Sequence, residues 1–331
     1  MKRSRETILS RRKFLELSTS ALIGSLLPGA LLTSCSKTLP PLRIGSNIWP
    51  GYELLFLARE LQILDDTLVN MIELPSASVC LEALAAETID GACLTLDEVL
   101  TAKSEGLDLV IVTILDISMG ADVILSNSKY KNFEQLKGKR IGVEQSAVGA
   151  VMLHSAIEKH GLNVSDFEIV HMNVNHHLNA FLQNQVDALV TFEPVVSQLE
   201  KHNALKLFSS ADIPGRIVDV IAVRPDVITK NPDAVRNLVA SHFSALQVFL
   251  NTPKQATPIM AKRLKLEASE VVDSYKDLVL PNIEENQKFL HGKSAELHAS
   301  AEKLATIMTD AKLLQRKPDT SNIINGDFLP G

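Results

Sequence analysis

Short apolar segments alternate with segments of helical periodicity over Leu42–Val223, and this alternation constrains the fold more than any other feature of the chain. One segment, Leu107–Leu115, is a near-continuous apolar run, typical of a strand covered on both faces. The repeated order of strand and helix predicts an α/β fold with mostly parallel sheets and helices on both sides. From Asn231 onward the spacing is helical, with one helix expected at Ala268–Asp277, so the C-terminal third is predicted to be mostly helical.

The alternating region divides into two similar units, although no internal sequence repeat is visible. A chain of this length usually splits into two lobes. We expect the first lobe to comprise residues 41–122 plus 222–331 and the second to comprise residues 123–221. Two short segments join the units, near Ser118–Asp122 and near Ile213–Asp219. Two strand-like crossings of this kind predict a hinge.

The N-terminus has the layout of an export signal. Residues 2–13 carry six bases and one acid, and no charge occurs over Leu17–Ser36. At the end of the basic region, Ser10–Leu15 resembles the twin-arginine export motif. Leu32–Cys35 resembles a bacterial lipobox, in which the cysteine is acylated.

These motifs predict a signal peptide at residues 1–34 and a lipidated tether at residues 35–40 that begins with Cys35. The alternatives are a retained transmembrane anchor, which Pro28 disfavours, and an incidental cysteine. We expect the protein in the cell envelope, in the periplasm or on the outer face of the membrane, held by its lipid anchor. Loss of residues 1–34 changes the formal net charge from −6 to −10. A net-acidic chain without basic runs argues against nucleic acid as a partner.

Cysteine and histidine give weak signals in the mature chain. Cys80 and Cys93 allow a disulfide in an oxidising compartment, but two buried free thiols fit their positions better. His171, His176 and His177 form the one histidine cluster. A metal site there would need further ligands in a matching spacing, so we expect a solvated helix start and no metal. No phosphate loop, nucleophile elbow or zinc-protease motif occurs.

Candidate binding residues follow the ends of predicted strands, where ligands of open α/β sheets bind. Trp49 and Tyr52 lie in a Trp-Pro-Gly-Tyr loop and are expected to face a cleft, although Trp49 can also serve only for packing. Ser146, Val148 and Gly149 open a predicted helix. Exposed N–H groups there bind anions, but Ser146 can also be a plain N-cap.

Four acids form the second group of candidates: Asp97, Asp122, Glu193 and Asp219. If they converge on one cleft, they favour a ligand with amine or amidine donors over an oxyanion, because the candidate loops hold no base. The alternatives are structural. Asp97 can cap the helix at 95–103, Glu193 can stabilise a helix start, and Asp219 can hold the hinge.

Four segments resemble the binding-protein family for nitrate, sulfonates, taurine and thiamine-pyrimidine precursors: Ile44–Tyr52, Met119–Asp122, Gly138–Val143 with Ser146–Gly149, and Val186–Pro194. Their order and spacing cover nearly all of residues 42–225. The resemblance implies a two-lobed type II periplasmic binding fold with the solute clamped between the lobes, and no catalysis in most members. The enzymes of one branch carry a Cys-rich run that this chain does not have.

The resemblance therefore predicts a substrate-binding protein that captures a small polar organic solute by hinge closure and delivers it to the permease of an ABC importer. We expect a monomer without a cofactor. One alternative is a sensory receptor that presents its closed form to a transmembrane signalling protein. A weaker one is a pyrimidine-forming enzyme. A neighbouring permease gene would favour the importer, and iron-dependent product formation would favour the enzyme.

Overall fold

The structure is a computed structural model that describes residues 39–144, 148–292 and 295–331. The predicted signal peptide, Cys35 and Ser146 therefore lie outside the described residues. Leu39–Gly331 forms one compact unit. Within the described ranges, no helix combines the length and the apolar character that a membrane span requires.

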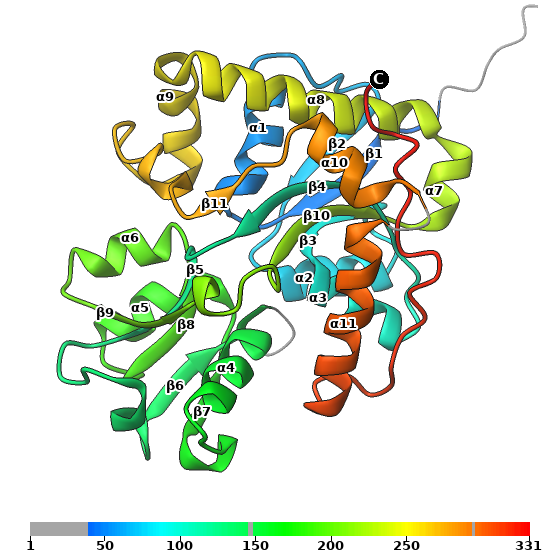
Figure 1. Cartoon of the computed structure of the whole chain (residues 1–331). Coiled ribbons are helices and arrows are strands. Elements are labelled where there is room, and N and C mark those ends of the chain that lie inside the picture. Colours follow the sequence, from blue (N-terminus) through cyan, green and yellow to red (C-terminus); the bar gives the residue numbers. More distant parts are fainter. Residues whose placement is uncertain (1–38, 145–147, 293–294) are drawn as a thin grey trace, which may run out of the picture. The chain divides into compact units, whose positions relative to one another are not determined.

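The first sheet, sheet A, has six strands in the order β11-β4-β10-β3-β1-β2. β1 pairs in parallel with β2 and β3, whereas β10 runs antiparallel to both β3 and β4. The bounds of the strands are β1 Leu42–Ser46, β2 Val69–Glu73, β3 Gly91–Thr95, β4 Val110–Ser118, β10 Val218–Val223 and β11 Leu278–Val279. Figure 1 shows this sheet beneath the long helix α8 (Pro232–Asn251).

Helices cover both faces of sheet A because successive strand residues point to opposite sides. Leu94 and Ile114 pack with α2 (Ala77–Ala85), α3 (Leu96–Ser104) and α11 (Glu296–Asp310). Their neighbours Cys93 and Leu115 pack on the other side. The helices there are α1 (Glu53–Glu60), α8 and α9 (Pro253–Leu264). The remaining helices beside this sheet are α7 (Pro225–Lys230) and α10 (Ile283–Leu290).

The second sheet, sheet B, has five strands in the order β7-β6-β8-β5-β9. Its strands are β5 Asp122–Ser126, β6 Arg140–Val143, β7 Glu168–His171, β8 Ala188–Phe192 and β9 Leu205–Ser209. α4 (Val148–Lys159) covers one face, and α5 (His177–Leu182) and α6 (Val195–Glu200) cover the other. β6 is parallel to β7 and β8, and β5 is antiparallel to β8 and β9.

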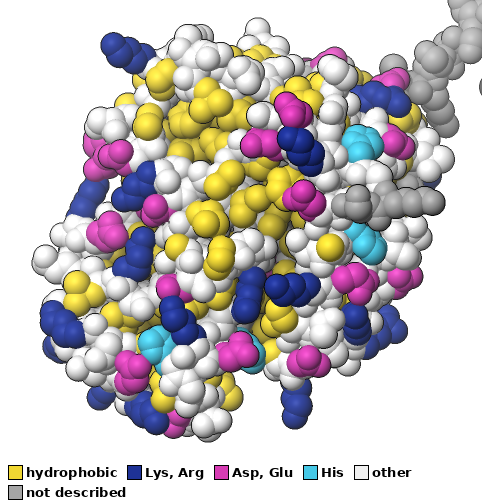
Figure 2. Space-filling view, in the orientation of Figure 1, with side chains coloured by type: hydrophobic (Ala, Val, Ile, Leu, Met, Phe, Trp, Pro, Cys, Tyr) yellow, Lys and Arg dark blue, Asp and Glu magenta, His cyan; other side chains and the backbone are white. Residues whose placement is uncertain are grey.

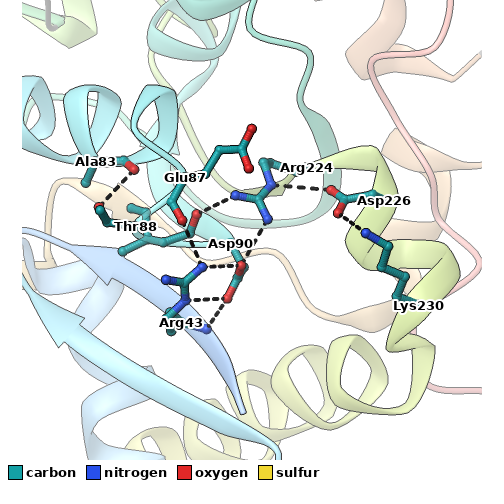
Figure 3. Close-up of polar contacts among 9 residues, drawn as sticks. Arg43, Ala83, Glu87, Thr88, Asp90, Arg224, Asp226 and Lys230 are labelled. Atoms are coloured by element: carbon teal, nitrogen blue, oxygen red, sulfur yellow. Dashed lines mark hydrogen bonds and ion pairs between the residues drawn. The ribbon is translucent and has the colours of Figure 1, made fainter. Parts of the chain in front are cut away.

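The two sheets repeat one arrangement, although the sequence shows no repeat. In each, three parallel strands are joined by an antiparallel strand that follows a crossing, β10 in sheet A and β5 in sheet B. An equivalent Arg–Asp ion pair occurs at the start of the first parallel strand in each sheet. Arg43 at the start of β1 binds Asp90 and the Glu87 carbonyl (Figure 3), and Arg140 at the start of β6 binds Asp187 and the Asn184 carbonyl.

The chain passes between the sheets after β4 and again after β9. The two crossings are bonded to each other, because the Ser118 and Ser210 hydroxyls lie 2.7 Å apart and the Gly120 N–H donates to the Ser210 hydroxyl. The sheets are more mixed than the sequence pattern indicated, since both crossing strands run antiparallel to their neighbours. The helix expected at Ala268–Asp277 is wrong, because the structure has only turns and a 3-10 segment, Asp273–Tyr275, there.

One face of the molecule shows acidic and basic side chains interspersed, with apolar side chains gathered beside α8 (Figure 2). The short helix α10 next to it carries charged side chains. A shallow apolar groove lies between these two helices and is lined in part by Phe243, Leu246, Ile283 and Pro330. It lies on the outer surface of the first lobe and contains no residue of the predicted site.

Candidate ligand-binding site

A small space lies where the carboxyl ends of β1, β3 and β8 meet the two crossings. It consists of two adjoining cavities of about 20 and 10 Å³, which we call the interlobe chamber. The first cavity is lined by Asn47, Trp49, Tyr52, Ala77, Thr95, Glu98, Asp122, Val148, Phe192 and Asp219, and the second by Asp122, Glu144, Val148, Gly149, Met152, Val190, Thr191 and Phe192. Each cavity has room for about one water molecule, so a larger solute can enter only if the surrounding side chains or lobes move apart.

The loop after β1 brings the aromatic residues into the chamber. A 3-10 turn at Pro50–Tyr52 reverses the chain and leads into α1. A side chain at Gly51 would place its Cβ 1.7 Å from Oδ2 of Asp116, so only glycine allows that carboxylate to approach the loop. The Trp49 indole N–H donates to the same oxygen at 3.1 Å. The Trp49 ring meets the edge of Phe192 from the second lobe at 5.5 Å.

Two carboxyl groups face each other across neighbouring strands. Asp116 of β4 and Asp219 of β10 are cross-strand partners, and the Tyr52 hydroxyl donates to Oδ1 of Asp219 at 2.5 Å. Oδ1 of Asp116 and Oδ2 of Asp219 have no hydrogen-bond partner among the described residues. Burial raises the pKa of Asp116 to about 7. Burial and the charge of Asp116 raise the pKa of Asp219 well above its usual range.

Asp122 is the carboxylate that both cavities share. Asp122 is the first residue of β5, and its side chain is buried. Its Oδ2 has no hydrogen-bond partner within the described part of the chain. Burial raises its pKa to about 7. Glu98 also lines the chamber, and Oε2 of Glu98 accepts a hydrogen bond from the Thr95 N–H in a capping box. Burial and the nearby Asp97 raise the pKa of Glu98 well above its usual range.

Glu144 reaches from the second lobe to a helix of the first. It follows β6, and its Oε1 accepts hydrogen bonds from the N–H of Ser78 at 3.1 Å and from the Ser78 hydroxyl. Ser78 lies in the first turn of α2, where backbone N–H groups have no intrahelical acceptor. Glu144 therefore occupies an anion-binding position of the kind that a helix N-terminus provides.

The structure brings most of the predicted site residues together. Trp49, Tyr52, Asp122, Val148 and Asp219 line the first cavity, and Gly149 lines the second with Asp122 and Val148. Trp49 is more deeply buried than a cleft-facing residue would be, because Phe192 covers it.

Two predicted acids lie outside the chamber lining. Asp97 is buried in the first turn of α3, but the cap of that helix comes from Thr95 and Glu98, and burial raises the pKa of Asp97 to about 6. The Glu193 side chain lies against α6, the helix that follows it, where the Ser197 N–H and hydroxyl donate to its two oxygens at 3.2 and 3.0 Å. This contact matches the helix-start role that the sequence offered as the alternative.

The histidine and cysteine expectations have different outcomes. His171 and His176 are exposed, as expected, but His177 is buried. Its ring contacts the Thr191 hydroxyl and the Met172 carbonyl, and burial lowers its pKa to about 4. No cluster suited to a metal ion occurs among the described residues. Cys80 and Cys93 are buried free thiols, as predicted, and burial raises the pKa of both.

The sequence reasoning missed Asp116, Glu144 and Phe192. Asp116 had a signal, because it is a lone acid at the end of an apolar strand. Glu144 also had one, because it directly follows β6, at the strand end where ligands of α/β sheets bind. Phe192 was visible only as a strand residue, and its role depends on contact with the other lobe.

Comparisons with known proteins agree with this architecture. The family described as NMT1/THI5 like matches residues 68–256. A binding protein of Brucella abortus is 26% identical over 155 residues, which are 46% of this chain and 49% of that protein, so the match spans about half of the relative. An aliphatic sulfonates-binding protein of Escherichia coli is 24% identical over 306 residues, 90% of this chain and 93% of that protein.

Among solved structures, the alkanesulfonate-binding protein of Xanthomonas axonopodis pv. citri, bound to MOPS, superimposes with a TM-score of 0.76 at 20% identity. The match covers 87% of this chain and 99% of that chain. This likeness concerns the fold, which is that of two-lobed periplasmic binding proteins. The chain belongs to the NMT1/THI5-like family.

Proposed function

We propose that the chain is an extracytoplasmic solute-binding protein that captures a small polar organic solute and delivers it to an ABC importer. The interlobe chamber carries this proposal. Both lobes contribute to its lining, and its buried oxygens without partners are the kind of group that a bound solute satisfies. The similarity to sulfonate-binding proteins supports the same role.

In this proposal, residues 41–122 plus 222–331 and residues 123–221 move as two bodies about the crossings that Ser118 and Ser210 join. Chamber contacts from both lobes exist together only in the closed form, so a solute favours closure by its difference in affinity for the two forms. Lys201–Glu270 at 2.7 Å is one ion pair at the rim of the closed form. It is half exposed and stabilises closure by little.

We further propose that the protein acts as a monomer held at the membrane by acylated Cys35, after export of the folded chain by the twin-arginine route and removal of residues 1–34. We propose no chemical step and no cofactor. The relatives described above are binding proteins.

A thermal-shift screen of the compact unit 39–331 tests the proposal. Amines, amidines, pyrimidines, sulfonates and nitrate are the solutes, and we expect one class to raise the melting temperature by mass action. A fluorophore pair on the two lobes should then report a shorter distance when that solute is added. Absence of a shift with every solute, or a shift without any change in distance, contradicts the proposal.

A further inference from the structure

The charge lining the interlobe chamber is all of one sign. Asp122, Asp219 and Glu98 line its first cavity, and Glu144 lines its second. The side chains of Asp122 and Asp219 are only 3% and 2% exposed, and Oδ2 of each has no hydrogen-bond partner among the described residues. A buried acceptor without a donor costs free energy, so a ligand group that donates hydrogen bonds to these oxygens would bind favourably.

Bases are absent from the same space. No Lys, Arg or His occurs among the described residues that line the two cavities. Residues 145–147, which follow Glu144 in the sequence, are also uncharged. An oxyanion placed here would therefore meet no base, only carboxyl groups and uncharged side chains, and its charge would be buried without a partner of opposite charge.

The most favourable anion site near the chamber is already filled from within. At the first turn of α2, Oε1 of Glu144 accepts from the backbone and hydroxyl of Ser78, and the Ser76 hydroxyl accepts from the Val79 N–H. A sulfonate or carboxylate group would have to displace this carboxylate of the chain itself.

Two aromatic rings complete the lining. Trp49 from the first lobe and Phe192 from the second face the first cavity together. The faces of aromatic rings attract cations, and the attraction is stronger where water is excluded.

We infer that the solute is a cation rich in N–H donors, such as a protonated amine, an amidinium or a protonated amino-substituted ring, and that Asp122 and Asp219 accept its hydrogen bonds. This inference rests on the proposed solute-binding role and specifies the chemical class of the solute. It differs from what the names of the sulfonate-binding relatives say of those proteins.

A matched series of three probes separates charge from shape: benzamidinium, its neutral isostere benzamide, and benzenesulfonate, all at one ionic strength. We expect benzamidinium to raise the melting temperature of the unit 39–331 and to bind at least about tenfold more tightly than either other probe. Asp122→Asn keeps the size of the side chain and should weaken benzamidinium binding by roughly tenfold to a hundredfold.

Asp66→Asn is the matched control, because Asp66 is an exposed acid of the first lobe, and it should leave binding unchanged. If Asp122→Asn does not fold, Asp219→Asn serves as the second variant. Tighter binding of benzenesulfonate or benzamide, no binding of benzamidinium, or equal benzamidinium affinity in the Asp122 and Asp66 variants overturns the inference. If an anion or a neutral solute binds with closure instead, the proposed function stands and this inference fails.

Discussion

Two sets of carboxyl groups at opposite ends of sheet A have opposite surroundings. Asp90, just before β3, binds Arg43 and Arg224 at 2.8 and 3.1 Å (Figure 3). Burial alone would raise the pKa of Asp90, but the hydrogen bonds and charge of Arg43, with Arg224, hold it below its usual range. Asp219 lies opposite the last residue of β3, where no described base contributes to its pKa, and that pKa is raised.

The difference separates structural groups from binding groups. A carboxylate with guanidinium partners stabilises the fold, and the second lobe repeats the device with Arg140 and Asp187. Carboxyl groups that are buried without a base destabilise the folded state when they are charged. Their retention at the carboxyl ends of the strands is expected where a ligand supplies the missing charge.

The largest loss of stability should follow from removing the carboxylate of Asp90, which pairs with Arg43 and Arg224. Asp90→Ala leaves Arg43 and Arg224 without their shared partner, and we expect the free energy of unfolding to fall by about 3–4 kcal/mol. The matched variant Asp187→Ala removes a single arginine pair in which Arg140 is 37% exposed, so a loss of about 2 kcal/mol is expected. Urea unfolding measures both. Equal losses would show that the second arginine contributes nothing.

A change of pH should give the next largest effect on the free energy of unfolding, through the buried carboxyl groups of the chamber that have no base beside them. The pKa of Asp116 and of Asp122 is raised from 3.8 to about 7. The folded chain therefore holds these protons more tightly than the unfolded chain does, and the stability that this gives is lost as the pH rises through about 7. We expect the share of Asp122 alone to lower the unfolding free energy without solute by about 3 kcal/mol from pH 5 to pH 8.

The control for this pH effect is Asp122→Asn, in which the fall should be smaller. A paired carboxylate behaves in the opposite way, because the lowered pKa of Asp90 gives stability that is lost in acid. A flat profile between pH 5 and pH 8 in both proteins would contradict the account of the chamber.

Removing one unpaired charge should stabilise the protein without solute. In Asp219→Asn the amide oxygen can still accept from the Tyr52 hydroxyl, while the repulsion with Asp116 disappears. We expect a gain of about 1–2 kcal/mol at pH 8, measured by urea unfolding. The gain should shrink as the pH falls, because the raised pKa of Asp219 favours its uncharged form in the wild type. A loss of stability at pH 8 would show that Asp219 is a structural group like Asp90.

Glu144 is an intermediate case, because its partners are the N–H and hydroxyl of Ser78. Glu144→Gln keeps an acceptor oxygen but removes the charge at the N-terminus of α2, so a loss of about 0.5–1 kcal/mol is expected. The same variant should shift the ligand-free protein toward the open form, which a fluorophore pair on the two lobes reports. An unchanged distance would remove Glu144 from the contacts that hold the lobes together.

Local pattern predicted much of this fold. Strands and helices alternate over Leu42–Val223 and the C-terminal third is mostly helical, as predicted, because apolar periodicity acts within each segment. β5 was missed, because only its first residue, Asp122, was considered, as the end of a crossing, although Asp122–Ser126 forms a strand inside sheet B. At Ala268–Asp277 the chain has helical spacing but folds into turns that bring the Tyr275 hydroxyl to the Pro50 carbonyl.

The chamber was only partly predictable for a related reason. Trp49, Tyr52, Asp122 and Asp219 follow or begin strands, and their convergence follows from the rule for parallel sheets. The Trp49–Asp116 bond and the Glu144–Ser78 bond join residues 67 and 66 positions apart. Contacts of this kind depend on how strands and lobes pack, which no local pattern encodes.

The pKa of Asp122 in the protein without solute tests the central claim most directly. Carbon-13 NMR of the side-chain carboxyl, with Asp122→Asn to assign the signal, measures it in the compact unit 39–331. The account predicts a midpoint near pH 7, because the carboxyl is buried without a base. A midpoint at or below the ordinary value of 3.8 would mean that a base or water already satisfies Asp122, and the chamber would then hold no unmet charge.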